Sequence, residues 1–371
     1  MPNPPLVKDH SQIRCIYCGY YIKSPYPTNL RCPKCNKFVI PIASPLNEKH
    51  APIDLDAERI DLKGKNEYVK LKGIYEYVKF YGITSHERTP LFASNKKWHY
   101  LLELTNNLDF IATSFLGGVL DKMLLKSENG ETKKCQFFEK NNIIYILYGK
   151  FPDKKGKWIL EILAKYFSDL VRGKDVNNLS RIDKYDIEKK FKDLIFKEFK
   201  LNFKEYRQLQ NAFIDQEILY AEDRIRLYYV GLSSMSIGVI SVLLDDEGKL
   251  NVKVPGEFED LAEEIEMKEA LLTAKIDAIN ANILGNTGAY PRWIAVKLGF
   301  QQYRFLTFRK CKKGYFLSCI AEGNLKKIEE IEDELEILLE HVIGVPFTGS
   351  LEEIRKIKKE IRKIIKEINK K

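Results

Sequence analysis

The fold of this chain follows from residues 135–149, which read CQFFEKNNIIYILYG. Two apolar arms flank Asn141-Asn142, a dipeptide that favours a tight turn, so the stretch predicts a β-hairpin. The second arm, Ile143–Gly149, is a continuous apolar run of the kind found in buried strands. Lys154–Val171 then repeats its large apolar residues at helical spacing. We therefore expect an antiparallel hairpin closed by an amphipathic helix.

The same pattern returns about 170 residues later. Gln302–Phe308 and Tyr315–Ala321 flank the turn Lys310–Gly314, and Leu325–Val342 carries one apolar stripe. The interval from the middle of the turn to the closing helix is 13 residues in both places. Such agreement indicates two copies of one small unit.

Each copy is preceded by a predicted strand pair and helix. In the first unit, residues 68–172, these are Tyr68–Ile83, Thr89–Ala93 and the helix Leu108–Leu125. In the second unit, residues 224–344, they are Arg224–Val230, Ile237–Leu244, a further strand at Leu250–Val254 and the helix Glu257–Ile283, which ends in a break at Gly285–Pro291. Short turns join successive strands, which disfavours a parallel sheet. The expected class is α+β, with two antiparallel-sheet units.

Helical segments connect and follow these units. Residues 173–223 form a predicted helical connector, which we expect to pack on one unit. Residues 351–371 carry isoleucines at steps of three and four and nine Lys or Arg against four Glu, which predicts a basic amphipathic helix. Such a helix can dock on a partner, lie on an anionic membrane, pair with another copy, or cover its own domain with a solvated basic face. The absence of aromatic residues weakens the membrane interpretation.

The N-terminal region contains a predicted metal site. Cys15 and Cys18 form one Cys-x-x-Cys pair, and Cys32 and Cys35 form a second pair after 13 intervening residues. Four thiolates at this spacing suit tetrahedral Zn²⁺ in a zinc ribbon over residues 11–40. Because all four positions are cysteines, the zinc is expected to be structural. An iron centre has the same geometry and stays an alternative, whereas disulfides would need an oxidising compartment.

Residues 11–40 are also basic and aromatic. They contain five Lys or Arg, no Asp or Glu, and four tyrosines, which is the composition of a nucleic-acid surface. The simpler interpretation is that the cations balance the thiolates and the tyrosines fill a small core. Residues 41–66 follow as a linker with three prolines and a charged stretch.

Composition and motifs limit the function classes. The 371 residues include 61 Lys or Arg and 52 Asp or Glu, which gives a net charge of +9. Because acidic residues are so numerous, any basic surface that binds nucleic acid must be local. No apolar run is long enough for a spanning helix, and no signal peptide is recognised, so we expect a cytoplasmic protein. Phosphate-binding glycine loops, a Gly-x-Ser-x-Gly elbow and His-Glu-x-x-His are all missing, and the expectation is that the protein is not an enzyme. His86 is expected to be a solvated turn residue.

The element order resembles the longin and roadblock superfamily. The resemblance rests on Tyr77–Ala93 as the opening strand pair, Leu108–Leu125 as the sheet-covering helix, Cys135–Gly149 as the hairpin and Lys154–Val171 as the last helix, with Arg224–Ile343 as a looser second copy. The Lys-, Ile- and Glu-rich composition with an N-terminal ribbon looks archaeal.

The resemblance implies non-catalytic work: scaffolding complexes and binding or activating small Ras-like GTPases. It implies a small GTPase or another longin/roadblock protein as partner, and pairing within the chain or in a homo- or heterodimer. The acidic start of the second unit's helix is a candidate partner surface: Glu257, Glu259, Asp260, Glu263 and Glu264. The alternative is that these acids simply solvate the helix. The alternative function is a nucleic-acid-binding or transcription-associated protein that acts through the ribbon.

Overall fold

The computed structural model describes residues 78–201, 225–234, 238–244, 249–250, 252, 254, 260–311, 315–343 and 350–370, and the backbone of 12–14 and 21–23. The chain divides into two compact units, Met1–Lys65 and Asn66–Lys371. In the N-terminal unit, Met1–Lys65, β1 (Gln12–Arg14) pairs antiparallel with β2 (Tyr21–Lys23). The remaining elements belong to Asn66–Lys371, called the large unit below.

Residues 78–201 form the first half of the large unit. The elements in chain order are β3 (Val78–Ser85), β4 (Pro90–Ala93), the short 3₁₀ helix η2 (Lys96–Trp98), α2 (Tyr100–Ser114), β5 (Val119–Ser127), β6 (Thr132–Lys140), β7 (Ile143–Gly149), α3 (Asp153–Leu170) and α4 (Arg181–Leu201). The predicted hairpin at 135–149 is confirmed, and Asn141 and Asn142 both have left-handed backbone, with φ of 55° and 59°.

Residues 225–370 form the second half. The elements in chain order are β8 (Arg226–Ser234), β9 (Gly238–Leu243), α6 (Leu261–Thr287), β10 (Ala289–Gly299), β11 (Gln302–Lys310), β12 (Phe316–Glu322), α7 (Leu325–Ile343) and α8 (Leu351–Ile368). The second predicted hairpin and the basic C-terminal helix are confirmed.

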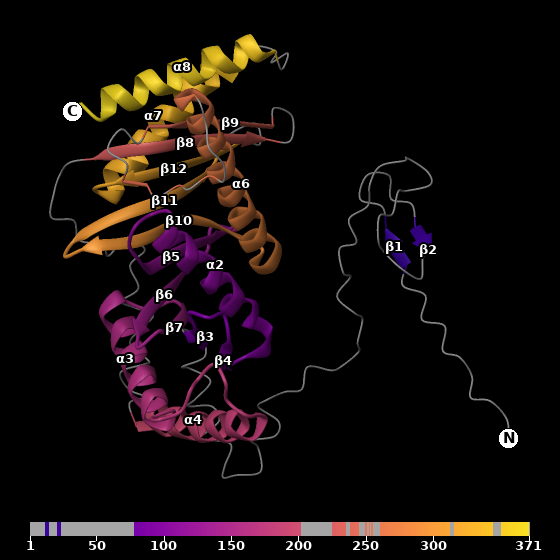
Figure 1. Ribbon diagram of the computed structural model, residues 1–371, viewed down its shortest axis with the longest axis vertical. Helices are drawn as coiled ribbons and strands as arrows, with labels where there is room; N and C mark the ends of the chain where they lie inside the picture. The colour runs from indigo at the N-terminus through magenta and orange to yellow at the C-terminus, as the bar shows by residue number, and fades with distance from the viewer. Residues whose placement is uncertain are drawn as a thin grey trace. The chain divides into compact units, whose positions relative to one another are not determined.

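The ten strands that the structure describes in the large unit belong to one antiparallel sheet (Figure 1). The order is β4-β3-β7-β6-β5-β10-β11-β12-β8-β9. In chain order, each half consists of a strand pair, a helix, three strands and a closing helix. Counted outward from the centre of the sheet, the corresponding strands of the two halves lie at corresponding positions. The two halves meet where β5 pairs with β10.

Helices cover both faces of this sheet. Alternate residues of β7 enter different cores: Ile144 and Ile146 pack with side chains of α2, and Tyr145 and Leu147 pack with α3 and α4. The α2 core continues across the joint into the second half, where it includes residues of α6. The opposite face of the second half packs against α7 and α8. The core under α2 and α6 is thus shared by both halves, the core under α3 and α4 lies within the first half, and the core under α7 and α8 takes in Leu124 of β5 besides residues of the second half.

Three sequence predictions about element boundaries are wrong. The helix expected at Leu108–Leu125 ends at Ser114, and its second part is strand β5. Gly117 has φ of 69°, and a Cβ on Gly118 would lie 2.5 Å from the carbonyl oxygen of Lys297, so the chain turns sharply here to reach β10.

The break expected at Gly285–Pro291 is also wrong. Helix α6 continues to Thr287 and is capped by Gly288 in left-handed conformation, and strand β10 begins at Ala289. Pro291 is tolerated inside this strand because the register with β5 shifts between Pro291 and Trp293. Leu250, predicted to begin a strand, has no strand assignment, and neither have the other described residues of that segment, 252 and 254.

The connector packs on the first half, as expected. Ile187, Phe191, Ile195 and Phe199 of α4 are buried against the core beneath α3. Residues 202–223 of the predicted connector lie outside the described residues. In the part of the chain that the structure describes, no helix has the length and apolarity needed to cross a bilayer.

Candidate functional site: the joint between the two halves

At the joint, the inner edge strand of one half, β5, pairs with the inner edge strand of the other half, β10, in close backbone contact. β5 and β10 pair along almost their whole length, from Ala289 opposite Ser127 to Lys297 opposite Val119, with two register shifts. Gly118 precedes β5 at the point where only hydrogen fits against the backbone of Lys297. Pairing two sheet edges in this way satisfies backbone groups that would otherwise be open to any strand.

A buried charged cluster lies on one side of the joint. Asp153, the first residue of α3, accepts hydrogen bonds from Lys122 of β5 and Lys134 of β6. The side chains of Lys122 and Lys134 are only 8% and 1% exposed. Asp121 lies 3.6 Å from the Lys122 ammonium, so two carboxylates balance two lysines. The cluster is neutral and closed, which makes it structural.

Electrostatics within the cluster follow from burial and pairing. Burial alone would raise the pKa of Asp153, but Lys122 and Lys134 outweigh it and hold that pKa below its usual value. For Asp121, burial is the larger effect and raises the pKa despite the neighbouring Lys122. For Lys122, burial would lower the pKa, but Asp121 and Asp153 raise it. Lys122 therefore remains charged.

Arg304 ties the two halves together on the other side of the sheet. It comes from β11, yet its guanidinium donates to the carbonyl oxygen of Leu116, just after α2, at 2.5 Å. The same group donates to the carbonyl of Lys249 at 3.1 Å and pairs with Glu322 at 2.9 Å. Its side chain is 4% exposed and lies over the ring of Tyr228. Sequence reasoning missed this residue, because nothing local marks an arginine that reaches across a domain joint.

His86 lies in the turn after β3, as expected, and its side chain is 28% exposed, but carboxylates lie near both ring nitrogens. Its Nδ1 lies 2.9 Å from Asp109 of α2, and its Nε2 lies 3.0 Å from Glu139 of β6. Burial raises the pKa of Asp109, and the neighbouring His86 opposes this rise. With a carboxylate near each ring nitrogen, His86 links α2 to β6. The remaining described cysteines, Cys135, Cys311 and Cys319, are buried as expected; burial raises the pKa of each thiol, and that of Cys311 reaches about 12.

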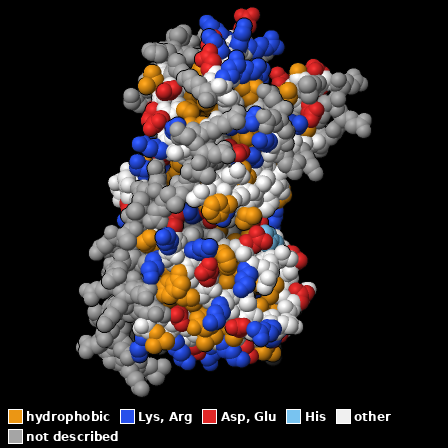
Figure 2. All heavy atoms as spheres, turned by 90° about the vertical axis from the view of Figure 1, so that its left-hand side faces the viewer, with side chains coloured by type: hydrophobic (Ala, Val, Ile, Leu, Met, Phe, Trp, Pro, Cys, Tyr) orange, Lys and Arg blue, Asp and Glu red, His pale blue; other side chains and the backbone are white. Residues whose placement is uncertain are grey.

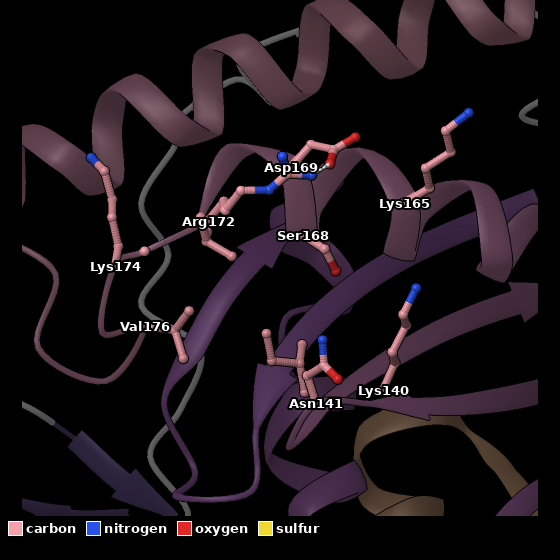
Figure 3. Close-up of a pocket in the computed structure, with 11 residues that line it drawn as sticks. Lys140, Asn141, Lys165, Ser168, Asp169, Arg172, Lys174 and Val176 are labelled. Atoms are coloured by element: carbon pink, nitrogen blue, oxygen red, sulfur yellow. Dashed lines mark hydrogen bonds and ion pairs between the residues drawn. The ribbon is translucent and has the colours of Figure 1, made fainter.

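A pocket of about 490 Å³ lies at the C-terminal end of α3, away from the joint (Figure 3). Its wall includes the cations Lys140, Lys165, Arg172 and Lys174. Arg172 is held by Asp169 at 2.7 Å, and Lys174 pairs with an aspartate of α4. The pocket can take a small anion, but half of its cations are already neutralised and the lining offers no catalytic arrangement.

The predicted acidic surface at the start of α6 is partly engaged. Asp260 caps the helix by accepting from the Ala262 amide at 2.9 Å, and Glu264 pairs with Lys268 at 2.7 Å. Glu263 is exposed in the first turn. Glu257 and Glu259 lie outside the described residues.

Glu269, one turn further along, is buried rather than available to a partner. It accepts from the backbone amide of Leu243 at 2.9 Å and pairs with Lys358 of α8 at 2.7 Å. This part of the acidic run serves the fold, since it anchors the C-terminal helix.

The four predicted zinc ligands, Cys15, Cys18, Cys32 and Cys35, lie outside the described residues. Within the described ranges, no cluster of three or more His, Cys, Asp or Glu could hold a metal ion. No known protein family matches the chain, and no curated protein matches it.

Proposed function

We propose that the protein is a non-catalytic scaffold or regulator of small Ras-like GTPases, of the kind found in membrane-trafficking-type complexes. One observation carries the proposal: the two halves of Asn66–Lys371 share one connectivity and join edge to edge. That connectivity fits the longin and roadblock resemblance, with three antiparallel strands where a hairpin was expected. Domains of this kind associate by joining sheets or packing helices, so a paired platform supports the proposal.

The pairing creates a surface to which both halves contribute. α2 of the first half and α6 of the second cover the same face of the sheet. Phe110 of α2 is 42% exposed, and the Lys275 ammonium of α6 lies 5.1 Å from its ring, with the Arg88 guanidinium 5.9 Å away. We call Arg88, Phe110 and Lys275 the α2–α6 surface. An exposed aromatic residue flanked by cations suits the centre of a protein interface.

Two further parts belong to the proposal. Structural Zn²⁺ held by Cys15, Cys18, Cys32 and Cys35 would fold the N-terminal ribbon, since four thiolates at this spacing are a tetrahedral donor set. The acidic start of α6, with Asp260, Glu263 and Glu264, would add an electrostatic contact for the GTPase. The protein would act in the cytoplasm, alone or as a homo- or heterodimer with another longin/roadblock protein.

The test is binding of the full chain to the small GTPases of its own organism, each in the GDP and GTP-analogue forms. We expect binding at micromolar concentration, weakened roughly tenfold or more by Phe110→Ala because aromatic anchors dominate such interfaces. Phe300→Ala is the matched control: Phe300 is 86% exposed but lies in the β10–β11 turn. An acidic contact at α6 should also weaken as salt rises from about 50 to about 200 mM.

The alternative function predicts a different result. If no GTPase binds, while a short nucleic acid binds and loses its affinity on removal of residues 1–45, the basic, tyrosine-rich ribbon is the functional part. The GTPase proposal is then wrong.

A further inference from the structure

The C-terminal helix α8 has its apolar face occupied by its own domain. Ile357, Ile361 and Ile365 are buried in the core that α8 shares with α7 and the sheet. Lys358 and Arg362 both reach the buried Glu269 of α6, at 2.7 and 3.6 Å. The isoleucine stripe is therefore not available for pairing with another copy or for insertion into a bilayer.

The end of the helix is fixed as well. The Asn369 side chain accepts a hydrogen bond from the Leu227 amide at 2.8 Å and donates one to the Leu227 carbonyl at 2.9 Å. The Ser350 hydroxyl caps the start by accepting from the Glu353 amide at 3.2 Å. Because both ends and the inner face are held, the outer face has a defined orientation.

That outer face is a basic ridge. At about 100° per residue, six exposed cations fall within an arc of roughly 100° opposite Ile361. They are Arg355, Lys356, Lys359, Lys363, Lys366 and Lys370. In the same arc, Glu352 in the first turn is the one acidic residue of α8.

The other glutamates of α8 are segregated from the ridge. Glu353, Glu360 and Glu367 recur at seven-residue spacing and so line one flank of the helix. The ion pairs that anchor α8 come from Lys358 and Arg362, which lie on the opposite flank. The ion pairs of α8 with the buried Glu269 do not use the six ridge cations, so the anchoring of the helix does not explain their arrangement.

We infer that the ridge docks the protein on a membrane surface that carries anionic lipid headgroups, with α8 lying parallel to the bilayer. From Arg355 to Lys370, which lies two residues past the end of α8 at Ile368, the ridge spans 15 residue steps, about 22 Å at 1.5 Å per residue. Figure 1 places α8 at one end of the large unit, and Figure 2 shows Lys and Arg side chains gathered at that end. Clusters of four to eight cations on a helix attract anionic lipid without apolar insertion.

The composition of the ridge favours lipid over nucleic acid. Five of its six cations are lysines, which act as hydrated point charges and suit attraction to a charged plane. Base reading and strand binding use Arg forks, amide side chains and aromatic rings, and the ridge has one Arg and none of the others. The lack of aromatic residues counts against insertion, which this mode of docking does not need.

The experiment measures co-sedimentation of the full chain with vesicles of neutral phosphatidylcholine, with and without about 30% phosphatidylglycerol. We expect binding to the anionic vesicles only, and loss of binding as salt rises from about 50 to about 200 mM. The variant Lys359→Gln, Lys363→Gln, Lys366→Gln, Lys370→Gln should bind at least about 100-fold more weakly, since each charge near the surface contributes several-fold.

The matched control removes the same charge elsewhere. Lys184, Lys189, Lys190 and Lys197 are exposed on α4, and their four-fold replacement by Gln changes net charge equally. This control should bind as the parent does. Equal losses in both variants would mean that net charge, not the ridge, attracts the lipid, and would overturn the proposal.

Two further outcomes would also overturn it. One is absence of binding to anionic vesicles at low salt. The other is ridge-dependent binding of duplex nucleic acid that is tighter than binding to the vesicles. Circular dichroism of both variants checks that α8 remains folded, and Gln is chosen because its helix propensity is close to that of Lys. GTPase binding through the α2–α6 surface is measured separately, so failure of one proposal leaves the other standing.

Discussion

At the scale of single residues, Glu332 of α7 is a buried carboxyl group with a raised pKa. The residue is 2% exposed, and its carboxylate accepts a hydrogen bond from the hydroxyl of Thr307. Burial raises its pKa from 4.5 to about 7, although Arg292 and Arg309 oppose the shift. Between these two values the folded state binds more protons than the unfolded state, so stability is full below pH 4.5 and falls as pH rises toward 7.

Replacing Glu332 with Gln should remove this pH dependence. The variant cannot ionise, so its free energy of unfolding should exceed that of the parent by an amount that grows from pH 4.5 to 7 and then levels at roughly 3 kcal/mol. Urea denaturation of both proteins at several pH values measures the difference. Parallel curves across the window would show that Glu332 is ionised in the folded protein, contrary to this account.

The pKa of Asp153 is shifted in the opposite direction to that of Glu332, so its effect on stability depends on pH in the opposite way. Its pKa is held low by Lys122 and Lys134, so its contribution to stability is present at neutral pH and is lost as pH falls through its folded pKa, below 3.8. Asp153→Asn should cost about 3–5 kcal/mol at pH 7, because two buried lysines lose their shared carboxylate. Asp169→Asn is the control: its partner Arg172 is 80% exposed, and the change should stay within about 1 kcal/mol. Thermal unfolding of both variants at pH 7 tests the contrast, which a small cost for Asp153→Asn would refute.

At the scale of elements, the sequence predicts every strand of the sheet correctly except β5 and β10. Strands flanked by Asn-Asn or Lys-Lys-Gly turns are local features, so alternation and turn residues identify them. β5 was hidden because Ile111, Phe115, Val119 and Met123 happen to lie at helical spacing, although Gly117 and Gly118 divide the run. β10 was not predicted because Pro291 near its start suggested a break in the chain rather than a strand. Both missed strands form the joint, where pairing with a distant edge decides the structure and local preference does not.

Gly118 provides a test of the joint. In Gly118→Ala, the new Cβ would lie 2.5 Å from the Lys297 carbonyl oxygen and 2.7 Å from Val296, so the strands must separate. We expect a loss of about 1–3 kcal/mol in the free energy of unfolding. Gly285→Ala is the matched control, because that glycine lies in α6 with nothing within 4 Å of the added Cβ, and the change should stabilise by up to about 1 kcal/mol. Hydrogen exchange should show faster exchange in β5 and β10 of Gly118→Ala; unchanged exchange would mean that the joint adapts without cost.

At the scale of the whole molecule, the large unit combines two topological copies but not two independent cores. The core under α2 and α6 contains side chains from both halves, among them Leu108, Met123, Ile294 and Leu306. Arg304 adds a hydrogen bond across the same joint. We therefore expect Asn66–Lys371 to unfold in a single transition. The tandem-unit organisation was accessible from the repeated spacing in the sequence, whereas this sharing of a core was not, because it depends on which edges meet.

The N-terminal unit should behave independently of that transition. Met1–Lys65 and Asn66–Lys371 are separate compact units, so we expect each to unfold on its own. If Cys15, Cys18, Cys32 and Cys35 bind zinc, elemental analysis should find about one zinc per chain, and Cys32→Ser should abolish it, since four thiolates are needed to fold so short a segment. In calorimetry, the main transition of Cys32→Ser should keep its midpoint to within about 2 °C, because no contact in the large unit is removed. A large downward shift would show that the ribbon is an integral part of the large unit, and iron in place of zinc would identify the site as a redox-capable centre instead.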